Sequence, residues 1–346
     1  MNSRDALEYL FSLEKRGIHL TLDHVSQLFH ALGNPQYAYK TVHVAGTNGK
    51  GSVAAMLASI LKHAGYRVGL YTSPHLVDFR ERIQLNGVML PEADLGDLVA
   101  HVRRHVTDET TFFEFATALA FLHFQEASVD IAVVEVGMGG RLDATNCIKP
   151  EVSIITNISR EHEHYLGSKL SSIAAEKGGI IKEGGICVTG VAQAGVRAVL
   201  KGIARERQAR LILKGKDFSV RCYAGRLFSY HGTTRRIRKL SLPLAGRHQV
   251  DNAALALAAS EVLSEKGMVI PDAAMIEGLA ATRWEGRLEP IRRNPLVVID
   301  GAHNPAGVRA LFRSLPHEFT YHRLVVLFGV MGDKRTYAYT AALRAV

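Results

Sequence analysis

The sequence is poor in cysteine. Its 346 residues include only Cys147, Cys187 and Cys222. These cysteines are odd in number, widely spaced and without a C-x-x-C pair, so they indicate neither a disulfide framework nor a thiolate zinc site. Such sparse cysteine use is typical of a reducing compartment, and we expect a cytoplasmic protein.

Long apolar runs are also absent. The longest, such as "ALALAA" at 254–259, fall far short of the ~20 residues that a membrane-spanning helix needs. The N-terminal segment lacks a basic stretch followed by an apolar one, so no signal peptide is predicted. We therefore expect no association with a membrane. Internal repeats and low-complexity segments are missing as well.

Acidic residues are outnumbered, and the formal net charge is +9. A basic protein can bind nucleic acid, but the lysines and arginines here are scattered, with only short clusters such as "TTRRIRK" at 233–239. This scatter favours a solvated surface or a site for small acidic substrates. We expect a monomer that binds small molecules and no nucleic acid.

What the sequence does contain is a regular alternation of β-branched runs with helical segments, which predicts a parallel sheet covered on both faces. The predicted strands are 39–46, 67–73, 129–137, 151–158 and 184–190, and the predicted helices between them are 52–65, 91–106, 112–127 and 171–178.

The second half of the chain changes character. Residues 211–242 predict short antiparallel strands, and a long helix is predicted at about 248–265. The apolar run "LVVID" at 296–300 then begins a second strand–helix–strand pattern that ends in "RLVVLFGVMGDK" at 323–334. The predicted fold class is thus α/β: a doubly wound parallel sheet of the P-loop type with a small antiparallel section, followed by a second, incomplete Rossmann-like domain. We place the two domains at 1–290 and 291–346.

The stretch "GTNGKGS" at 46–52 joins the first predicted strand to a helix. It departs twice from the pattern G-x-x-x-x-G-K-[ST], because Val44 stands where a glycine is expected and Gly51 separates Lys50 from Ser52. It still supplies flexible glycines, a helix N-terminus, an ammonium group and a hydroxyl that could bind magnesium. These are the parts of a phosphate-binding loop, although a strand-to-helix turn of this kind also occurs without a ligand.

Polar side chains follow three other predicted strands. Ser73, Glu135 and His162 come at or just after strand ends, where open α/β sheets bind ligands. An acid such as Glu135 can hold magnesium near a nucleotide, and a salt-bridged structural acid is the alternative. The H-x-H spacing of His162 and His164 has no further spaced ligands, so we do not predict zinc there.

Taken together and in this order, "GTNGKGS", "TSPHL", "EVGMGGRLDATN", "EKGGII" and "DGAHNP" resemble the folylpolyglutamate synthase and dihydrofolate synthase family. That family belongs to the wider Mur-ligase group of ATP-dependent, amide-forming enzymes. The resemblance extends from about Leu22 to Lys334. The phosphate loop is shared across the wider group, whereas "TSPHL" and "GGRLDATN" are more specific to the folate branch.

The resemblance implies a role for each matching residue. Three residues would be catalytic: Lys50, His162 and Lys177, the last as a carbamylated lysine. ATP would be bound by Thr47, Asn48, Gly49, Lys50, Gly51, Ser52, Asn252, Arg287, Asp300 and His303. The pterin would be bound by Leu22, Asp23, His24, Phe112, Phe113, Glu114, Leu142, Asp143 and Ala144. Two Mg²⁺ ions would be held by Ser73, Glu135 and His162.

The implied reaction joins L-glutamate to dihydropteroate or to a reduced folate such as tetrahydrofolate, through an acyl phosphate formed with ATP. Two features depart from the family pattern. Glu161 stands where an aspartate is usual, and the chain ends at Val346, earlier than family members do. Two alternatives stay open: a Mur-type cell-wall peptide ligase, and a non-catalytic ATP-binding relative that lacks a complete C-terminal domain.

Overall fold

A computed structural model describes residues 1–329 of the chain. Its centre is an eight-stranded sheet with the strand order β4-β3-β2-β5-β1-β6-β7-β8. The six strands from β2 to β8 in this order are parallel, and β3 and β4 extend the β2 edge as an antiparallel hairpin. The strands are β1 (Lys40–Ala45), β2 (Val68–Tyr71), β3 (Ile83–Leu85), β4 (Val88–Met89), β5 (Ile131–Glu135), β6 (Val152–Ile155), β7 (Ile186–Thr189) and β8 (Arg210–Leu213).

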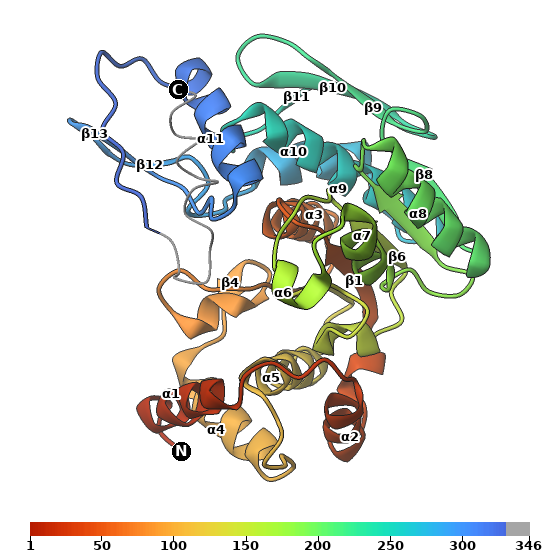
Figure 1. Cartoon of the computed structure of the whole chain (residues 1–346), viewed down its shortest axis with the longest axis vertical. Helices are drawn as coiled ribbons and strands as arrows, with labels where there is room; N and C mark the ends of the chain where they lie inside the picture. Colours follow the sequence, from red (N-terminus) through yellow and green to blue (C-terminus); the bar gives the residue numbers. More distant parts are fainter. Residues whose placement is uncertain (330–346) are drawn as a thin grey trace.

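Both faces of this sheet are buried, as its near-continuous apolar strands require. In β5, Ile131 and Val133 belong to one core cluster, and Ala132 and Val134 to another on the opposite face. The first face is covered by α3 (Lys50–His63), α9 (Arg247–Glu265) and α10 (Asp272–Ala281). The second is covered by α1 (Ser3–Ser12), α2 (Asp23–Ala31), α4 (Glu92–Arg103) and α5 (Phe112–Glu126). In Figure 1 the second set lies toward the bottom of the view and the first set lies above it.

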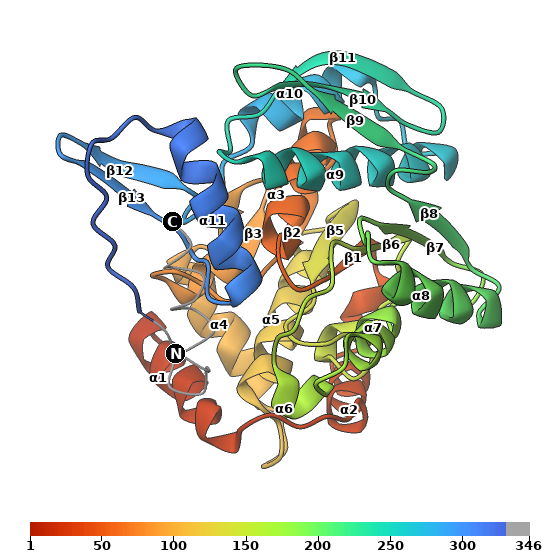
Figure 2. The ribbon, with the colours of Figure 1, turned by 45° about the horizontal axis from the view of Figure 1, so that its top comes forward.

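The β6–β8 end of the sheet has its own small core, in which α7 (Leu170–Gly178) and α8 (Ala194–Glu206) pack. A separate antiparallel sheet, β9 (Ser219–Cys222), β10 (Leu227–His231) and β11 (Arg236–Ser241), lies over α9 and α10 (Figure 2). Among the described residues, no helix is long and apolar enough to cross a membrane.

The predicted doubly wound sheet and the antiparallel section are confirmed, with one correction at their junction. Residues 211–213 were predicted to belong to the antiparallel section, but they form β8 at the parallel edge, paired with β7. A four-residue apolar strand carries no sign of its partner's direction, so the sequence alone could not separate these two pairings.

The prediction of a second strand–helix–strand unit was only partly correct. The segment β13 (Leu296–Ile299) pairs in antiparallel fashion with β12 (Glu289–Arg293), and α11 (Pro305–Glu318) follows. Of the run predicted at 323–334, residues 323–329 form no strand, and residues 330–334 lie outside the described residues. The apolar strand predicted at 296–300, of a type usually buried, is instead half-exposed, because its only strand partner within the described residues is β12. The boundary at 290/291, which β12 crosses, stays a prediction.

Candidate active site

The segment between β1 and α3 is a sharp turn that only glycine can make. Gly46 has a φ of 146°, and a Cβ there would lie 1.9 Å from the hydroxyl oxygen of Thr156. Gly49 has a φ of 83°, and a Cβ there would lie 2.5 Å from Oδ1 of Asn252. Positive φ and close contacts together exclude a side chain at both positions.

The turn is held in place by the segment that follows β6. The Thr47 hydroxyl donates to the carbonyl of Ser159 (3.1 Å) and accepts from its N–H (3.0 Å). The carbonyl of Asn48 accepts from the hydroxyl of Thr156 (2.7 Å) and from the amide of Asn157 (2.8 Å). These three partner residues were not predicted from the sequence. Their hydrogen bonds fix the loop before any ligand arrives.

The first turn of α3 presents the groups that a phosphate needs. Its leading N–H groups have no acceptor within the helix, and the helix dipole favours an anion at this end. The Ser52 hydroxyl is buried, at 1% exposure, and makes no hydrogen bond among the described residues. Within residues 1–329, Lys50 makes only a long hydrogen bond, 3.3 Å, with the carbonyl of Thr47. A phosphate with its cation would satisfy both side chains.

Gly51, the extra glycine between Lys50 and Ser52, has a physical reason. A Cβ on Gly51 would lie 2.8 Å from the indole ring of Trp284, so the first turn of α3 packs directly under that ring. Trp284 is the chain's one tryptophan. Gly51 therefore allows a close approach of backbone and ring.

Two of the predicted metal ligands lie side by side on neighbouring strands. Glu135 is the last residue of β5, and its Oε2 accepts a hydrogen bond of 3.2 Å from the backbone N–H of Ser73, just beyond β2. Burial raises the pKa of Glu135, and the nearby charge of Lys50 opposes that shift. A bound cation would act in the same direction as Lys50 and keep the carboxylate ionised.

His162 reaches the same edge of the sheet by a different route. It follows β6, adopts a left-handed backbone conformation with a φ of 44°, and begins the short helix α6 (Glu163–Leu166). Because β2, β5, β1 and β6 are neighbours in the sheet, the segments that carry Ser73, Glu135, the phosphate loop and His162 leave one edge together.

Lys177 lies beneath the phosphate loop rather than in solvent. Its ammonium group, on α7, donates to the carboxylate of Glu161 (2.6 Å) and to the carbonyl of Gly46 (3.0 Å). Both side chains are buried. Burial lowers the pKa of Lys177, which Glu161 partly offsets, whereas the charges of Lys177 and Lys50 outweigh burial and hold the pKa of Glu161 below its usual range.

The predicted ATP contacts from the second half of the chain divide into two groups. Asn252, on α9, lies against Gly49 and donates to Gln249 Oε1 (2.9 Å), so it faces the phosphate loop. Asp300 instead uses both carboxylate oxygens on backbone N–H groups, those of Leu288 (2.9 Å) and Ala302 (2.8 Å). In this structure Asp300 therefore fastens the segment that enters α11.

Two other residues lie near this segment. Arg287 contacts the carbonyl of Gly286 at 3.3 Å, and the His303 ring pairs with the carbonyl of Gly301 at 2.9 Å. A residue that was not predicted from the sequence joins this part to the phosphate loop: the side-chain amides of Asn304 and Asn48 exchange two hydrogen bonds, of 2.8 and 3.2 Å. Their sequence separation of 256 residues left no local signal.

A cavity of about 250 Å³ lies beside the predicted metal ligand Ser73. Ser73, already in contact with Glu135, forms part of its wall. Five of the predicted substrate residues line it: Phe113, Glu114, Leu142, Asp143 and Ala144. Asp143 is buried, which raises its pKa, and its oxygens accept hydrogen bonds from the N–H groups of Met138 and Thr145.

The other four predicted substrate residues do not line this cavity. Leu22 packs against the core beneath it, and Asp23 accepts from the Thr21 hydroxyl. His24 pairs with Glu109 (2.8 Å). Phe112 stacks on Phe11, with ring centroids 6.0 Å apart.

Arg82 is a cavity residue that the sequence analysis did not single out. Its guanidinium group lies 5.2 Å from the centroid of the Phe112 ring and donates to Nδ1 of His75 (2.8 Å). The residue is 8% exposed, and burial lowers its pKa. A buried cation in a mostly apolar cavity favours a ligand that carries a carboxylate.

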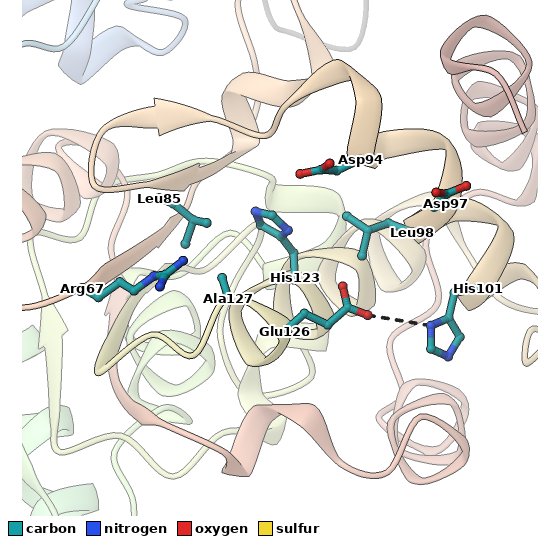
Figure 3. A pocket seen from close by; sticks show the side chains of 9 residues that line it. All are labelled: Arg67, Leu85, Asp94, Asp97, Leu98, His101, His123, Glu126 and Ala127. Carbon is teal, nitrogen blue, oxygen red and sulfur yellow. Dashed lines mark ion pairs between the residues drawn. The ribbon is translucent and has the colours of Figure 1, made fainter.

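A second cavity, of about 440 Å³, adjoins the start of β2, at the end of the parallel strands away from the phosphate loop. Figure 3 shows the side chains that line it. The carboxylates of Asp94, Asp97 and Glu126 line it, and Glu126 pairs with His101 at 3.9 Å. It adjoins Arg67, just before β2, and none of the strand-end groups described above lines it. It is therefore separate from the candidate active site.

Comparisons with known proteins agree with this arrangement. Residues 44–260 match the Mur ligase middle domain, and residues 286–345 match the Mur ligase glutamate ligase domain. The folylpolyglutamate synthase of Lacticaseibacillus casei is 38% identical over 350 residues, which cover 96% of this chain and 81% of the relative. The dihydrofolate synthase/folylpolyglutamate synthase of Bacillus subtilis is also 38% identical, over 96% of this chain and 80% of its own.

The chain belongs to the Mur ligase family, in its folylpolyglutamate and dihydrofolate synthase branch.

Solved structures of this branch share the fold of the ligase. The apo form of the L. casei folylpolyglutamate synthase superposes with a TM-score of 0.87 at 37% identity, covering 93% of this chain and 82% of that one. The Mycobacterium tuberculosis folylpolyglutamate synthase complexed with ADP gives a TM-score of 0.90 at 38% identity, covering 99% and 80%. The family resemblance seen in the sequence is thereby confirmed, and the ligase is an ATP-dependent enzyme by family.

Proposed function

We propose that this ligase attaches L-glutamate to the carboxylate of dihydropteroate and of reduced folates, with ATP as the co-substrate. One observation carries the proposal. Ser73 forms part of the cavity wall and donates its N–H to Glu135, whose ionisation is influenced by Lys50 of the phosphate loop. A substrate in the cavity would thus place a carboxylate next to the γ-phosphate of ATP.

The chemistry explains why these two sites must adjoin. A carboxylate oxygen is a poor leaving group, so its direct reaction with an amine fails at neutral pH. Transfer of the γ-phosphoryl group to that oxygen forms an O–P bond, breaks the bond to ADP and gives an acyl phosphate. The glutamate amine then attacks the acyl carbon, forms the amide, and releases phosphate and a proton. Positioning and charge neutralisation are the main tasks of the protein in such a transfer.

Lys50 and the first turn of α3 would bind the transferred phosphoryl group. The ammonium and the free N–H groups face a charge that spreads over the phosphate oxygens during transfer. Ser73, Glu135 and His162 would hold magnesium at the same edge, and the Ser52 hydroxyl, which has no partner among the described residues, would be a further oxygen ligand. Magnesium, when bound, would screen the repulsion between ATP and the acceptor carboxylate.

The cavity would hold the pterin end of the acceptor between the Phe113 ring and the carboxylates of Glu114 and Asp143. A pterin is a flat ring with several N–H groups, so buried carboxylates are suitable acceptors for it. We infer that Arg82 draws the negatively charged end of the acceptor toward Ser73. Among the remaining predicted residues, Asn252 is the one that lies against the phosphate loop, and we keep it as an ATP contact.

Carbamylation of Lys177 is part of the proposal. The reaction joins the neutral amine to carbon dioxide by an N–C bond and releases a proton. Burial, which lowers the Lys177 pKa, helps this reaction, whereas the 2.6 Å pair with Glu161 must open to allow it. Carbon nuclear magnetic resonance with labelled bicarbonate tests this step, and a carbamate signal absent from Lys177→Met is expected.

Turnover of single variants tests the site as a whole. Lys50→Ala and Glu135→Ala should each abolish pterin-dependent ADP release while the circular dichroism spectrum stays unchanged. Lys62→Ala removes a lysine from the exposed end of the same helix and is the matched control, with full activity expected. Full activity of either site variant would contradict the assignment.

A further inference from the structure

Three side chains that the proposed reaction leaves partly unexplained converge beside the pterin cavity. His19 lies in the loop after the 3₁₀ turn Leu13–Arg16, His24 in the first turn of α2, and Glu114 in the first turn of α5. Each offers one ligand atom, and these atoms lie within 4.8 Å of one another. The two imidazole rings meet edge to face, with centroids 5.8 Å apart.

Two polar atoms of this cluster are buried without a partner among the described residues: Nδ1 of His24 and Oε1 of Glu114. Glu114 as a whole is only 4% exposed. A buried polar atom without a hydrogen bond is destabilising, because folding removes its hydrogen bonds to water. Two such atoms in one cluster indicate that a ligand belongs there.

The other ligand atoms of His24 and Glu114 already have partners, which orient the two unpartnered atoms. Nε2 of His24 pairs with the carboxylate of Glu109 (2.8 Å), which favours a proton on Nε2 and leaves the lone pair on Nδ1. Oε2 of Glu114 accepts from the N–H and the hydroxyl of Thr111, both at 2.8 Å. A carboxylate behind a histidine and hydrogen bonds behind a ligating acid are the usual supports of metal ligands.

We propose that His19, His24 and Glu114 bind a divalent transition-metal ion of the zinc class. Two imidazoles and one carboxylate form a donor set that suits zinc and leaves one position open for water or substrate. Ligand bonds of about 2.0–2.2 Å place the donor atoms roughly 3–4 Å apart, within the observed limit of 4.8 Å. Magnesium prefers oxygen ligands and does not compete for this set.

The site would couple to the acceptor cavity, and this part rests on the proposed function. His19 and Glu114 line the cavity as well as the cluster, so a bound ion would narrow it and occupy the Glu114 carboxylate. Zinc should therefore weaken the binding of dihydropteroate.

Calorimetric titration of the whole chain with zinc chloride tests the site. The titration is made without nucleotide and with excess magnesium, so that magnesium competes with zinc for the oxygen-rich catalytic site. One zinc per chain is expected. His19→Ala alters an exposed loop and should weaken zinc binding by at least ~10-fold, since even the loss of an outer-shell group costs ~10–100-fold. The Co²⁺ form should show a visible absorption spectrum that the variant lacks.

The matched control is His105→Ala. His105 is a neighbour of His101 at a centroid distance of 5.9 Å, close to the His19–His24 spacing. Glu126 contacts His101 there, but among the described residues no third ligand atom lies within 4.8 Å of both imidazoles. This variant should bind zinc like the wild type, and so should His162→Ala. Absence of zinc binding at micromolar concentration, unchanged binding by His19→Ala, or loss in His162→Ala would each overturn the proposal.

A separate titration with dihydropteroate separates the two proposals. Weaker pterin binding in zinc, reversed by His19→Ala, supports both. Stoichiometric zinc that leaves pterin affinity unchanged would support the metal site and contradict the placement of the pterin beside Glu114.

Discussion

The buried pair of Lys177 and Glu161 is where the structure makes its sharpest energetic prediction. The two charged atoms are 2.6 Å apart, and the side chains are 2% and 5% exposed. Removing one partner leaves the other charge buried without compensation, which costs about 3–5 kcal/mol. In the protein without the proposed carbamate, Glu161→Gln and Lys177→Met should each lower the free energy of unfolding by that amount, and Lys177→Met also removes the bond to the Gly46 carbonyl.

The double variant Glu161→Leu/Lys177→Met removes both charges together. Because neither then remains unpaired, its destabilisation should be smaller than the sum of Glu161→Leu and Lys177→Met by about 2–3 kcal/mol. Urea unfolding followed by far-ultraviolet circular dichroism measures the free energies of unfolding of the wild type, Glu161→Leu, Lys177→Met and the double variant. Fluorescence of Trp284, which packs on the phosphate loop, reports the same transition locally. Single-variant effects that add within ~0.5 kcal/mol would refute the coupled buried pair.

Three further variants test separate parts of the account. Gly46→Ala places a Cβ against Thr156 at positive φ and should lower both the free energy of unfolding and the affinity for ATP. Gly65→Ala, with a φ of 90° and open space around it, is the control and should cost only ~1–2 kcal/mol of stability, with ATP affinity unchanged. Equal losses of ATP affinity in the two variants would argue against an ATP-binding role of the loop. Arg82→Lys should raise the KM for the pterin acceptor ~10-fold or more and leave the KM for ATP unchanged. The reason is that an ammonium group cannot both stack on the Phe112 ring and donate hydrogen bonds as the guanidinium group does. Steady-state kinetics in which the KM for ATP rises and that for the acceptor does not would contradict this role of Arg82. Burial holds the pKa of His43 well below its usual value, so the folded protein binds fewer protons than the unfolded one and loses stability as pH falls below ~6.5. In His43→Gln the free energy of unfolding should therefore fall less steeply with pH than in the wild type, by up to ~1.4 kcal/mol per pH unit. Identical slopes for the two proteins in urea unfolding would disprove this.

Much of the fold could be predicted because its signals are local. Runs such as "VDIAVVEVG" combine β-branched residues with a closing glycine, and the helix after each run carries its own punctuation. The carboxyl ends of parallel strands meet at one edge, so the proximity of Ser73 and Glu135 followed from their places in the chain. The strand at 296–299 was misjudged because an apolar run says nothing about which partner is available.

The parts of the site that escaped prediction depend on contacts between distant segments. Arg82 reads as an ordinary surface arginine until Phe112 packs beside it. Asn304 is the N-cap of α11, a position that asparagine often occupies. Its hydrogen bonds with Asn48 are visible only in the structure. His19 lies in a loop without regular structure, and only the arrival of α5 brings Glu114 to it.

The measurement that tests the central claim most directly is ADP release by the purified 346-residue chain with Mg-ATP and L-glutamate. Dihydropteroate, tetrahydrofolate and no acceptor are compared side by side. The account predicts release that depends on both L-glutamate and a pterin acceptor, with a product heavier by one glutamate. Release that ignores the acceptor, or bound ATP without any pterin-dependent release, would contradict the account and favour a non-catalytic nucleotide-binding relative.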